Sequence, residues 1–150
     1  TREQWQQAAA AWQRWTPTLQ TWFAPATQAM IEPGNITRGS RVLDVAAGAG
    51  EPACTFARTV GATGYVLATD IAPNIVELAR RAAAEQGLTQ VEPRVMDGEE
   101  LDVPDASFDA AASERGAVVV FPSFEYHRVL PMRSGVRCSL VTWVSGPPFR

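Results

Sequence analysis

The sequence predicts an α/β fold with a mostly parallel sheet, and three observations favour this class. Short apolar segments alternate with helical segments from residue 41 onward. A glycine-containing turn at residues 48–50 follows the first apolar segment. Aspartates stand within or just after three successive predicted strands. Because strand–helix alternation produces βαβ units with right-handed crossovers, the strands of such a fold lie parallel.

The predicted strands are short apolar runs, and the predicted helices lie between them. We expect strands at residues 42–46, 65–69, 91–95, 108–112 and 136–144. We expect helices from the glycine turn to about residue 60, from residue 73 to 86, and over a short stretch at 123–130. Proline suits the first turn of a helix and glycine its end, and the second of these helices has both signals.

The N-terminal region predicts two helices ahead of this core. Three tryptophans, the last of them Trp15, recur at spacings that place them on one face of a helix over residues 3–15. A second helix is expected over residues 17–31, and the Pro-Gly-Asn sequence at 33–35 ends it. The tryptophans either pack in the core or form an aromatic lid over a ligand pocket, and the sequence leaves both interpretations open.

Length and composition indicate one ordinary folded domain over residues 1–150, with a helical cap at 1–37 and the core at 38–144. The chain is 46% hydrophobic and 19% charged, and its net charge is −3. That charge gives no general attraction for nucleic acid or for an anionic membrane. No apolar run has the length of a membrane span, and the N-terminus lacks the apolar core of a signal peptide.

The two cysteines, Cys54 and Cys138, are isolated from each other in the sequence. Such a pair makes neither a disulfide framework nor a zinc site, so no metal is expected. Both lie among apolar residues, which predicts buried free thiols and a reducing cytoplasm.

Polar residues at the strand ends define the predicted site. In an open parallel sheet, ligands bind beyond the carboxyl ends of the strands. Asp44 lies within the first strand, and Asp70, Asp97 and Ser113 follow the next three. One carboxylate at a strand end would mean little, but three at successive strand ends indicate a binding site.

The glycine turn has a mechanical role in this prediction. Gly48 and Gly50 let the backbone bend sharply and approach a ligand with no Cβ in the way. The helix that follows is expected to point its free N–H groups at that ligand. A tight strand-to-helix turn without a ligand is the alternative interpretation.

Asp70 and Asp97 are the predicted contacts to an adenosine. Asp70 follows Gly50 by 20 residues, where a carboxylate accepts hydrogen bonds from both ribose hydroxyls. Its alternative role is that of a carboxylate at the N-terminus of the next helix. Asp97 can accept a hydrogen bond from the adenine amino group, joined by the backbone at Gly98 and Glu99; its alternative role is to cap a loop.

These segments resemble a known family. Residues 44–50, DVAAGAG, are similar to the first motif of class I S-adenosylmethionine-dependent methyltransferases, acidic-x-Gly-x-Gly-x-Gly, with Ala46 in place of the first glycine. Residues 68–73 resemble the second motif, and residues 94–109 resemble the region of the third and fourth strands. The likeness is greatest to small-molecule methyltransferases of the ubiquinone and menaquinone biosynthesis type.

The resemblance implies a Rossmann-like three-layer sandwich with strand order 3-2-1-4-5, S-adenosyl-L-methionine as cofactor and a small-molecule acceptor. It implies that Asp44 and the turn containing Ala46, Gly48 and Gly50 hold the methionine part. Asp70 would bind the ribose, and Ile71 would pack on the adenine. The remaining implied cofactor contacts are Asp97, Gly98 and Glu99 at the adenine edge, Ser113 beside the methionine part, and Trp15 in the helices over the cofactor.

The sequence departs from the family pattern after the fourth strand. Residues 121–130 are shorter than the family helix, and 131–135 replace a Pro-Gly-Gly turn. The predicted fifth strand lies near residue 150, and we expect a fold that lacks the sixth and seventh strands of the family. We expect the apolar edge at 140–143 to pair with a partner, which is consistent with a natural minimal form, a truncated form or a homodimer.

Two other functions remain open, and no catalytic residue is singled out. His127 is either a surface or packing residue or a catalytic base, and Glu114, Arg115 and Tyr126 are weak acceptor-side candidates. A nicotinamide-dependent oxidoreductase fits the G-x-G-x-x-A spacing at 48–53, although the chain has no lysine and hence no Tyr-x-x-x-Lys pair. A non-catalytic domain that binds the cofactor or a partner is the third interpretation.

Overall fold

The described helices and strands lie between residues 2 and 111 of the 150-residue chain. The computed structural model describes residues 2–32, 34–98, 100–103 and 108–111. These ranges contain three helices, α1 (Arg2–Ile31), α2 (Ala53–Val60) and α3 (Pro73–Glu85). They also contain four strands, β1 (Arg41–Val45), β2 (Tyr65–Asp70), β3 (Val91–Val95) and β4 (Ala110–Ala111).

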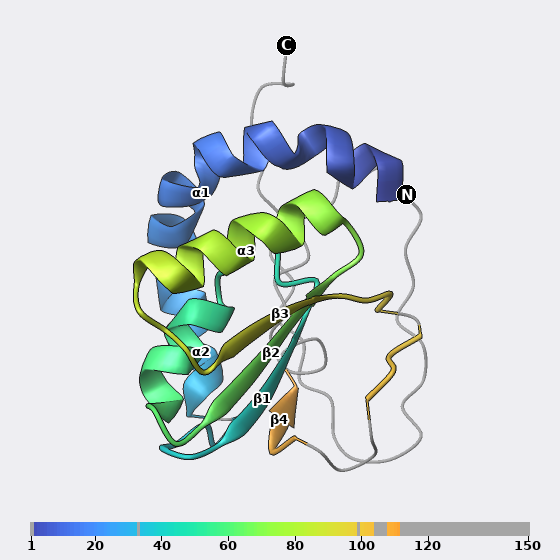
Figure 1. The fold of residues 1–150 in the computed structure, drawn as a ribbon. Coiled ribbons are helices and arrows are strands. Elements are labelled where there is room, and N and C mark those ends of the chain that lie inside the picture. The colour runs from blue at the N-terminus through green and yellow to red at the C-terminus, as the bar shows by residue number, and fades with distance from the viewer. Residues whose placement is uncertain (1, 33, 99, 104–107, 112–150) are drawn as a thin grey trace.

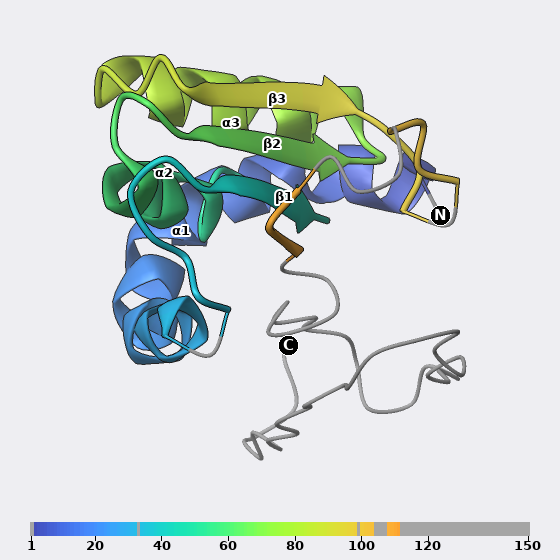
Figure 2. The same ribbon diagram turned by 90° about the horizontal axis from the view of Figure 1, so that it is seen from below.

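All strand pairs in the described part of the chain are parallel, in the order β3-β2-β1-β4. This confirms the first four positions of the predicted order 3-2-1-4-5. The predicted fifth strand at 136–144, the helix at 123–130 and Ser113 lie outside the described residues. Figures 1 and 2 show the three helices gathered on one face of the sheet.

Two apolar clusters hold the sheet. On the helical face, Val42 and Val66 pack in one core cluster with Phe56 and Val60 of α2. On the opposite face, Leu43, Val45 and Leu67 form a second cluster with partly buried Leu101, Val103 and Phe108. Because successive residues of a strand face opposite sides, an uninterrupted apolar run is what a strand buried on both faces requires.

Strand β4 begins two residues later than the predicted strand at 108–112, whose last residue lies outside the described residues. The Arg41 N–H donates to the side-chain Oδ2 of Asp109 at 2.8 Å, while the Asp109 N–H donates to the Arg41 carbonyl at 2.8 Å. The Asp109 side chain therefore accepts the Arg41 N–H, which a backbone carbonyl would accept if the strand were longer. Regular pairing of β1 with β4 begins one residue later, at Val42 with Ala110.

The prediction of two N-terminal helices is wrong, because α1 is one helix with Pro17 and Pro25 inside it. Proline lacks the N–H that would bond to the preceding turn, and it bends a helix that packing holds together. Figure 1 shows α1 bending as it passes from α3 toward α2. Hydroxyls of Thr16 and Thr21 donate to the carbonyls four residues earlier, at 2.7 and 3.0 Å, a contact that also favours bending.

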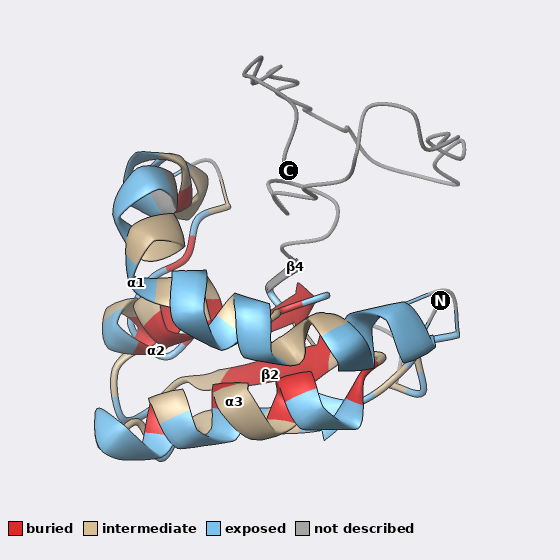
Figure 3. Ribbon diagram, turned by 90° about the horizontal axis from the view of Figure 1, so that it is seen from above, coloured by how far each residue is buried: buried red, intermediate tan, exposed pale blue. Residues whose placement is uncertain are grey.

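Core packing does not explain three of the four tryptophans of α1, while Trp12 is half-buried. The exposed fractions of Trp5, Trp15 and Trp22 are 38%, 55% and 69%, and Trp5 lies 6.1 Å from Trp12 between ring centroids. Figure 3 shows much of α1 exposed above the buried sheet. The core interpretation is therefore wrong for these three side chains, and the aromatic lid stays a prediction.

The helices α2 and α3 confirm the other boundary signals. Pro73 stands at the first turn of α3, and Gly87 follows its end with φ 66°. The end of α1 at Ile31 also agrees with the prediction. None of the helices in the described ranges combines the length and apolar character that a membrane span needs.

Candidate functional site

The turn between β1 and α2 uses its two glycines in different ways. Gly48 has φ 58°, and a Cβ built there would meet no heavy atom within 4 Å. Gly50 has φ 109°, and a Cβ there would lie 3.3 Å from Ala79 Cα and 3.3 Å from Ala82 Cβ. Gly48 therefore borders open space, while Gly50 lets the turn approach α3 closely.

Asp44 is a buried carboxylate with one unused oxygen. It lies in β1 with an exposed fraction of 1%. The backbone N–H of Ala53, at the start of α2, bonds to the carboxylate, and Oδ2 has no hydrogen-bond partner. Burial raises the pKa of Asp44 to about 7; the Ala53 N–H opposes that rise, and the negative charges of Glu51 and Asp70 add to it.

Asp70 joins the glycine turn to the start of α3. Its Oδ2 accepts the Gly48 N–H at 3.2 Å, and its Oδ1 accepts the Ala72 N–H at 3.0 Å. Burial raises the pKa of this carboxyl, while hydrogen bonds from Ala72, Gly48 and Ile71 oppose the rise. Both predicted roles are thus compatible with its position: it terminates β2, and it accepts N–H groups ahead of α3.

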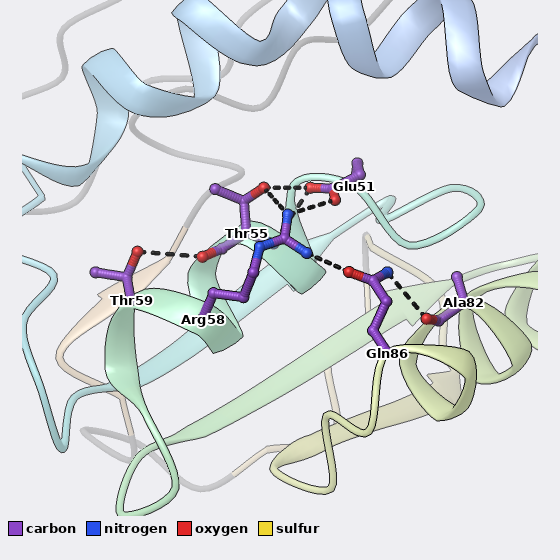
Figure 4. Close-up of polar contacts among 6 residues, drawn as sticks. All are labelled: Glu51, Thr55, Arg58, Thr59, Ala82 and Gln86. Atoms are coloured by element: carbon purple, nitrogen blue, oxygen red, sulfur yellow. Dashed lines mark hydrogen bonds and ion pairs between the residues drawn. The ribbon is translucent and has the colours of Figure 1, made fainter.

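Glu51 belongs to this edge as well, and the sequence reasoning missed it. Its Oε2 accepts the N–H of Thr55 at 3.2 Å and the hydroxyl of Thr55 at 2.7 Å. Arg58 donates to Glu51 Oε1 at 3.1 Å, to the Thr55 hydroxyl at 2.8 Å, and to Gln86 beyond α3 (Figure 4). The available signal was an acidic residue two positions before the start of a helix, with a threonine four positions after it.

The first turn of α2 corrects one prediction. Its N–H groups are not free to meet a ligand. Those of Ala53, Cys54 and Thr55 are taken by Asp44, by the Gly50 carbonyl and by Glu51, respectively. The unpaired N–H groups of a helix start must find acceptors, and here nearby side chains and the turn supply them.

The loop after β3 passes across the end of β1. The Met96 N–H donates to the Asp70 carbonyl at 3.0 Å. Asp97 is exposed and forms an isolated antiparallel bridge with Glu100. A Cβ on Gly98 would lie 3.0 Å from Val45 Cγ1, so this glycine permits the crossing.

The structure therefore brings together the predicted residues of β1, of the glycine turn, of the end of β2 and of the loop after β3. Ile71 is half-buried beside Asp70, and Ala46 is exposed in the turn with φ 60°. Trp15 lies on α1, and Glu99 and Ser113 are outside the described residues. No group of acidic, histidine or cysteine side chains in the described ranges has the arrangement of a metal site.

The chemistry of this edge fits S-adenosylmethionine. Ionised carboxylates only accept hydrogen bonds, so a ligand here must supply donors or positive charge. S-adenosylmethionine supplies an ammonium, a sulfonium and ribose hydroxyls, and the unpartnered Oδ2 of Asp44 calls for such a donor. The open space beside Gly48 leaves room for such a ligand against the backbone of the turn.

The same edge disfavours a dinucleotide. The pyrophosphate of a nicotinamide cofactor normally binds free N–H groups at the helix start. Here Asp44 and Glu51 already use those of Ala53 and Thr55, and their charges would repel phosphate. The oxidoreductase alternative therefore lacks the anion site that it needs.

Comparison with known proteins identifies the family. Residues 42–132 match the methyltransferase domain family, so the chain belongs to that family. It is 40% identical over 89 residues to aklanonic acid methyltransferase DauC of Streptomyces sp. strain C5, a match covering 58% of this chain and 40% of the relative. It is 38% identical over 80 residues to the ubiquinone/menaquinone biosynthesis C-methyltransferase UbiE of Ectopseudomonas oleovorans, covering 53% and 47%.

A solved structure supports the fold and the class. A SAM-dependent methyltransferase from Aquifex aeolicus shares 27% identity with a TM-score of 0.51, over 55% of this chain and 44% of that one. Together these matches confirm the predicted class, the S-adenosylmethionine-dependent methyltransferases with a Rossmann-like fold. The matches span less than half the length of the two curated relatives.

The cysteine in the described part of the chain has no sign of a chemical role. Cys54 is a free thiol, buried in α2. Burial raises its pKa to about 11, with the charge of Glu51 adding to the rise. A thiol that stays protonated at neutral pH is a poor nucleophile, so Cys54 acts as a packing residue.

Proposed function

We propose that this chain binds S-adenosylmethionine at the carboxyl edge of β1 and β2 and transfers its methyl group to a small-molecule acceptor. The observation that carries the proposal is the buried carboxylate of Asp44, whose Oδ2 has no partner and which lies at the strand end before the open turn at Gly48. A buried polar oxygen without a partner costs free energy, and a cationic ligand group would remove that cost.

The proposed roles follow from the position of each residue. Asp44 and the turn containing Ala46, Gly48 and Gly50 hold the methionine part. Asp70 accepts backbone N–H groups from Gly48, Ala72 and Ile71, which leaves acceptor capacity on its carboxylate for the ribose. Ile71 packs against the adenine. The remaining proposed contacts are Asp97, Gly98 and Glu99 at the adenine edge, with Ser113 and Trp15 near the methionine part.

The electrostatics of the edge favour a positive ligand. The negative charges of Glu51 and Asp70 both act on Asp44, and Arg58 pairs with only Glu51 among these three carboxylates. The cofactor supplies a methyl group on a positively charged sulfur, already activated for transfer. The protein then has to align an acceptor with that group and exclude water, which is positioning chemistry.

Calorimetric titration tests this proposal directly. The chain is titrated with S-adenosylmethionine, with S-adenosylhomocysteine and with NADH. We expect binding of both adenosyl ligands and none of NADH. NADH binding without binding of either adenosyl ligand would overturn the proposal in favour of an oxidoreductase.

A methyl-transfer assay separates an enzyme from a binding domain. The matches to DauC and UbiE, both named as methyltransferases of small molecules, support acceptors such as phenols and quinols, with amines as a third class to test. We expect turnover on at least one class. Tight cofactor binding with no turnover on any of them would favour the non-catalytic alternative.

Four further parts of the proposal concern the domain organisation, the location in the cell, nucleic-acid partners and the oligomeric state. A single domain with residues 1–37 as its cap is supported by α1 packing on α3, where Asn74 donates to the Gln6 carbonyl at 2.6 Å. A reducing cytoplasm is supported by the free thiol of Cys54. The net charge of −3 supports the absence of a nucleic-acid partner. A homodimer is the remaining part, and size-exclusion chromatography tests it.

A further inference from the structure

Two carboxylates share the first turn of α2. Asp44 accepts the N–H of Ala53, and Glu51 accepts the N–H of Thr55, two residues further along the same helix. Adjacent N–H groups of one helical turn lie close together, so the two carboxylates are neighbours. The carboxylate of Glu51 has an exposed side-chain fraction of 20%, and that of Asp44 is enclosed.

The two carboxylates differ in how their charge is compensated. Glu51 has three donors from α2: the N–H and hydroxyl of Thr55, and the guanidinium of Arg58. Asp44 has one backbone donor, and its Oδ2 has none. The charged groups that act on Asp44 from the elements around it are Glu51 in the turn and Asp70 at the end of β2, and both are negative.

These contacts compensate the carboxylate of Glu51 and leave that of Asp44 uncompensated. Two adjacent carboxylates do not ionise equally when one is solvated and paired and the other is buried. Arg58 lies at 3.1 Å from Glu51 and holds its charge in place, while Thr55 fixes its position (Figure 4). Asp44 is then the member that keeps a proton when no ligand compensates it.

We propose that Glu51 is a positioning residue that couples cofactor binding to proton release: its carboxylate, held beside Asp44 on the first turn of α2, adds to the burial that keeps Asp44 protonated in the ligand-free chain. When the ammonium of the methionine part binds, the Asp44 proton passes to solvent and the ionised carboxylate accepts the ligand's hydrogen bond. The pKa of Asp44, raised to about 7, agrees with this order of events. The inference rests on the proposed function, because it needs the methionine part at Asp44.

Proton release on binding is measured by calorimetry. The chain is titrated with S-adenosylhomocysteine between pH 5.5 and 8.5, in two buffers that differ in ionisation enthalpy. We expect the wild-type chain to release a proton below about pH 7 and to bind more tightly as pH rises. The pH at which release is half complete is the quantity to compare among variants.

Two substitutions are expected to move that pH in opposite directions. Glu51→Gln removes the neighbouring charge and keeps an acceptor for Thr55, so the midpoint should fall by roughly half a pH unit, about a twofold gain in affinity at pH 6.5. Arg58→Gln leaves Glu51 charged without its partner, so the midpoint should rise. A general folding defect would not produce opposite shifts.

The control is Glu92→Gln on β3. Glu92 is likewise paired with an arginine, Arg94, and its loss changes the net charge equally, but its charge is not among those that act on Asp44. We expect an unchanged midpoint. Should Glu51→Gln fail to fold, the wild-type midpoint and its rise in Arg58→Gln decide the question.

The outcomes separate the two proposals. If the wild-type chain does not bind S-adenosylhomocysteine, the proposed function itself fails. If it binds without proton release, or if the midpoints of the Glu51 and Arg58 variants equal that of the wild type, only the role of Glu51 is overturned.

Discussion

The backbone N–H of Gly48 donates to Oδ2 of Asp70 at 3.2 Å, so the turn after β1 is tied to the carboxylate that ends β2. The same carboxylate accepts the Ala72 N–H ahead of α3. One side chain therefore fixes the positions of two segments at the carboxyl edge of the sheet. A substitution at Asp70 should affect both the ligand contacts and the shape of the turn.

Replacement of Asp70 by alanine should weaken binding of S-adenosylhomocysteine by roughly 1.5–3 kcal/mol, because hydrogen bonds to a charged acceptor are lost. That change is about a 10- to 150-fold rise in Kd, measurable by calorimetry. Glu85→Ala, at the exposed end of α3, is the control and should leave Kd unchanged. Unchanged affinity in Asp70→Ala would remove Asp70 from the site.

Alanine at the two glycines should separate binding from stability. At Gly50 a methyl group would press on the Ala79 backbone, and φ is 109°, so Gly50→Ala should lower the free energy of unfolding by more than about 1 kcal/mol. At Gly48 the methyl group meets no atom within 4 Å, but φ is 58°, so Gly48→Ala should cost only the strain of the left-handed backbone, roughly 1 kcal/mol, and should weaken cofactor binding in addition. Urea unfolding and calorimetry on both variants measure the two effects. Equal loss of affinity in stable forms of both variants would contradict this division of roles.

Much of the fold was predictable because its signals are local. The largely apolar runs of β1 and β2 are bounded by turn residues, and the ends of α3 have proline and glycine where helices accept them. The break predicted at Pro17 failed for the opposite reason. A local rule forbids proline inside a helix, but packing on α3 keeps α1 continuous and the proline only bends it.

The residues of the site could be predicted from the sequence, but their hydrogen bonds and the interactions of their charges could not. Asp44 attracted attention because a charged residue inside an apolar strand is unusual. The sequence did not show that Asp44 and Glu51 occupy the N–H groups of α2, since both contacts depend on how the turn folds back over β1. The difference between Gly48 and Gly50 likewise depends on the distance to α3.

Ala46 occupies a backbone conformation that favours glycine. Its φ is 60°, in the left-handed region, at the position where the family motif has glycine. Ala46→Gly should raise the free energy of unfolding by about 0.5–1 kcal/mol, because the Cβ strain is relieved at some cost in chain entropy. Denaturant unfolding measures the change. Ala49→Gly in the same turn is the control, and it should destabilise the chain because Ala49 is not among the residues with positive φ.

Asp44 should make the stability of the ligand-free chain fall as pH rises from about 4 to about 7. Its pKa is about 7 in the folded chain and 3.8 ordinarily, so the unfolded chain gives up this proton first as pH rises. Over that window the folded state binds more protons than the unfolded state, and the free energy of unfolding therefore decreases with pH, by up to about 4 kcal/mol for this group. Asp44→Asn cannot ionise, so its free energy of unfolding should lack this decrease and its advantage over the wild type should grow toward pH 7. Urea unfolding of both chains at pH 4.5, 6 and 7.5 gives the difference, from which the contributions of the other carboxylates cancel. A difference that stays constant across these three values would show that Asp44 ionises at its ordinary pH and that the burial of its carboxylate has no electrostatic cost.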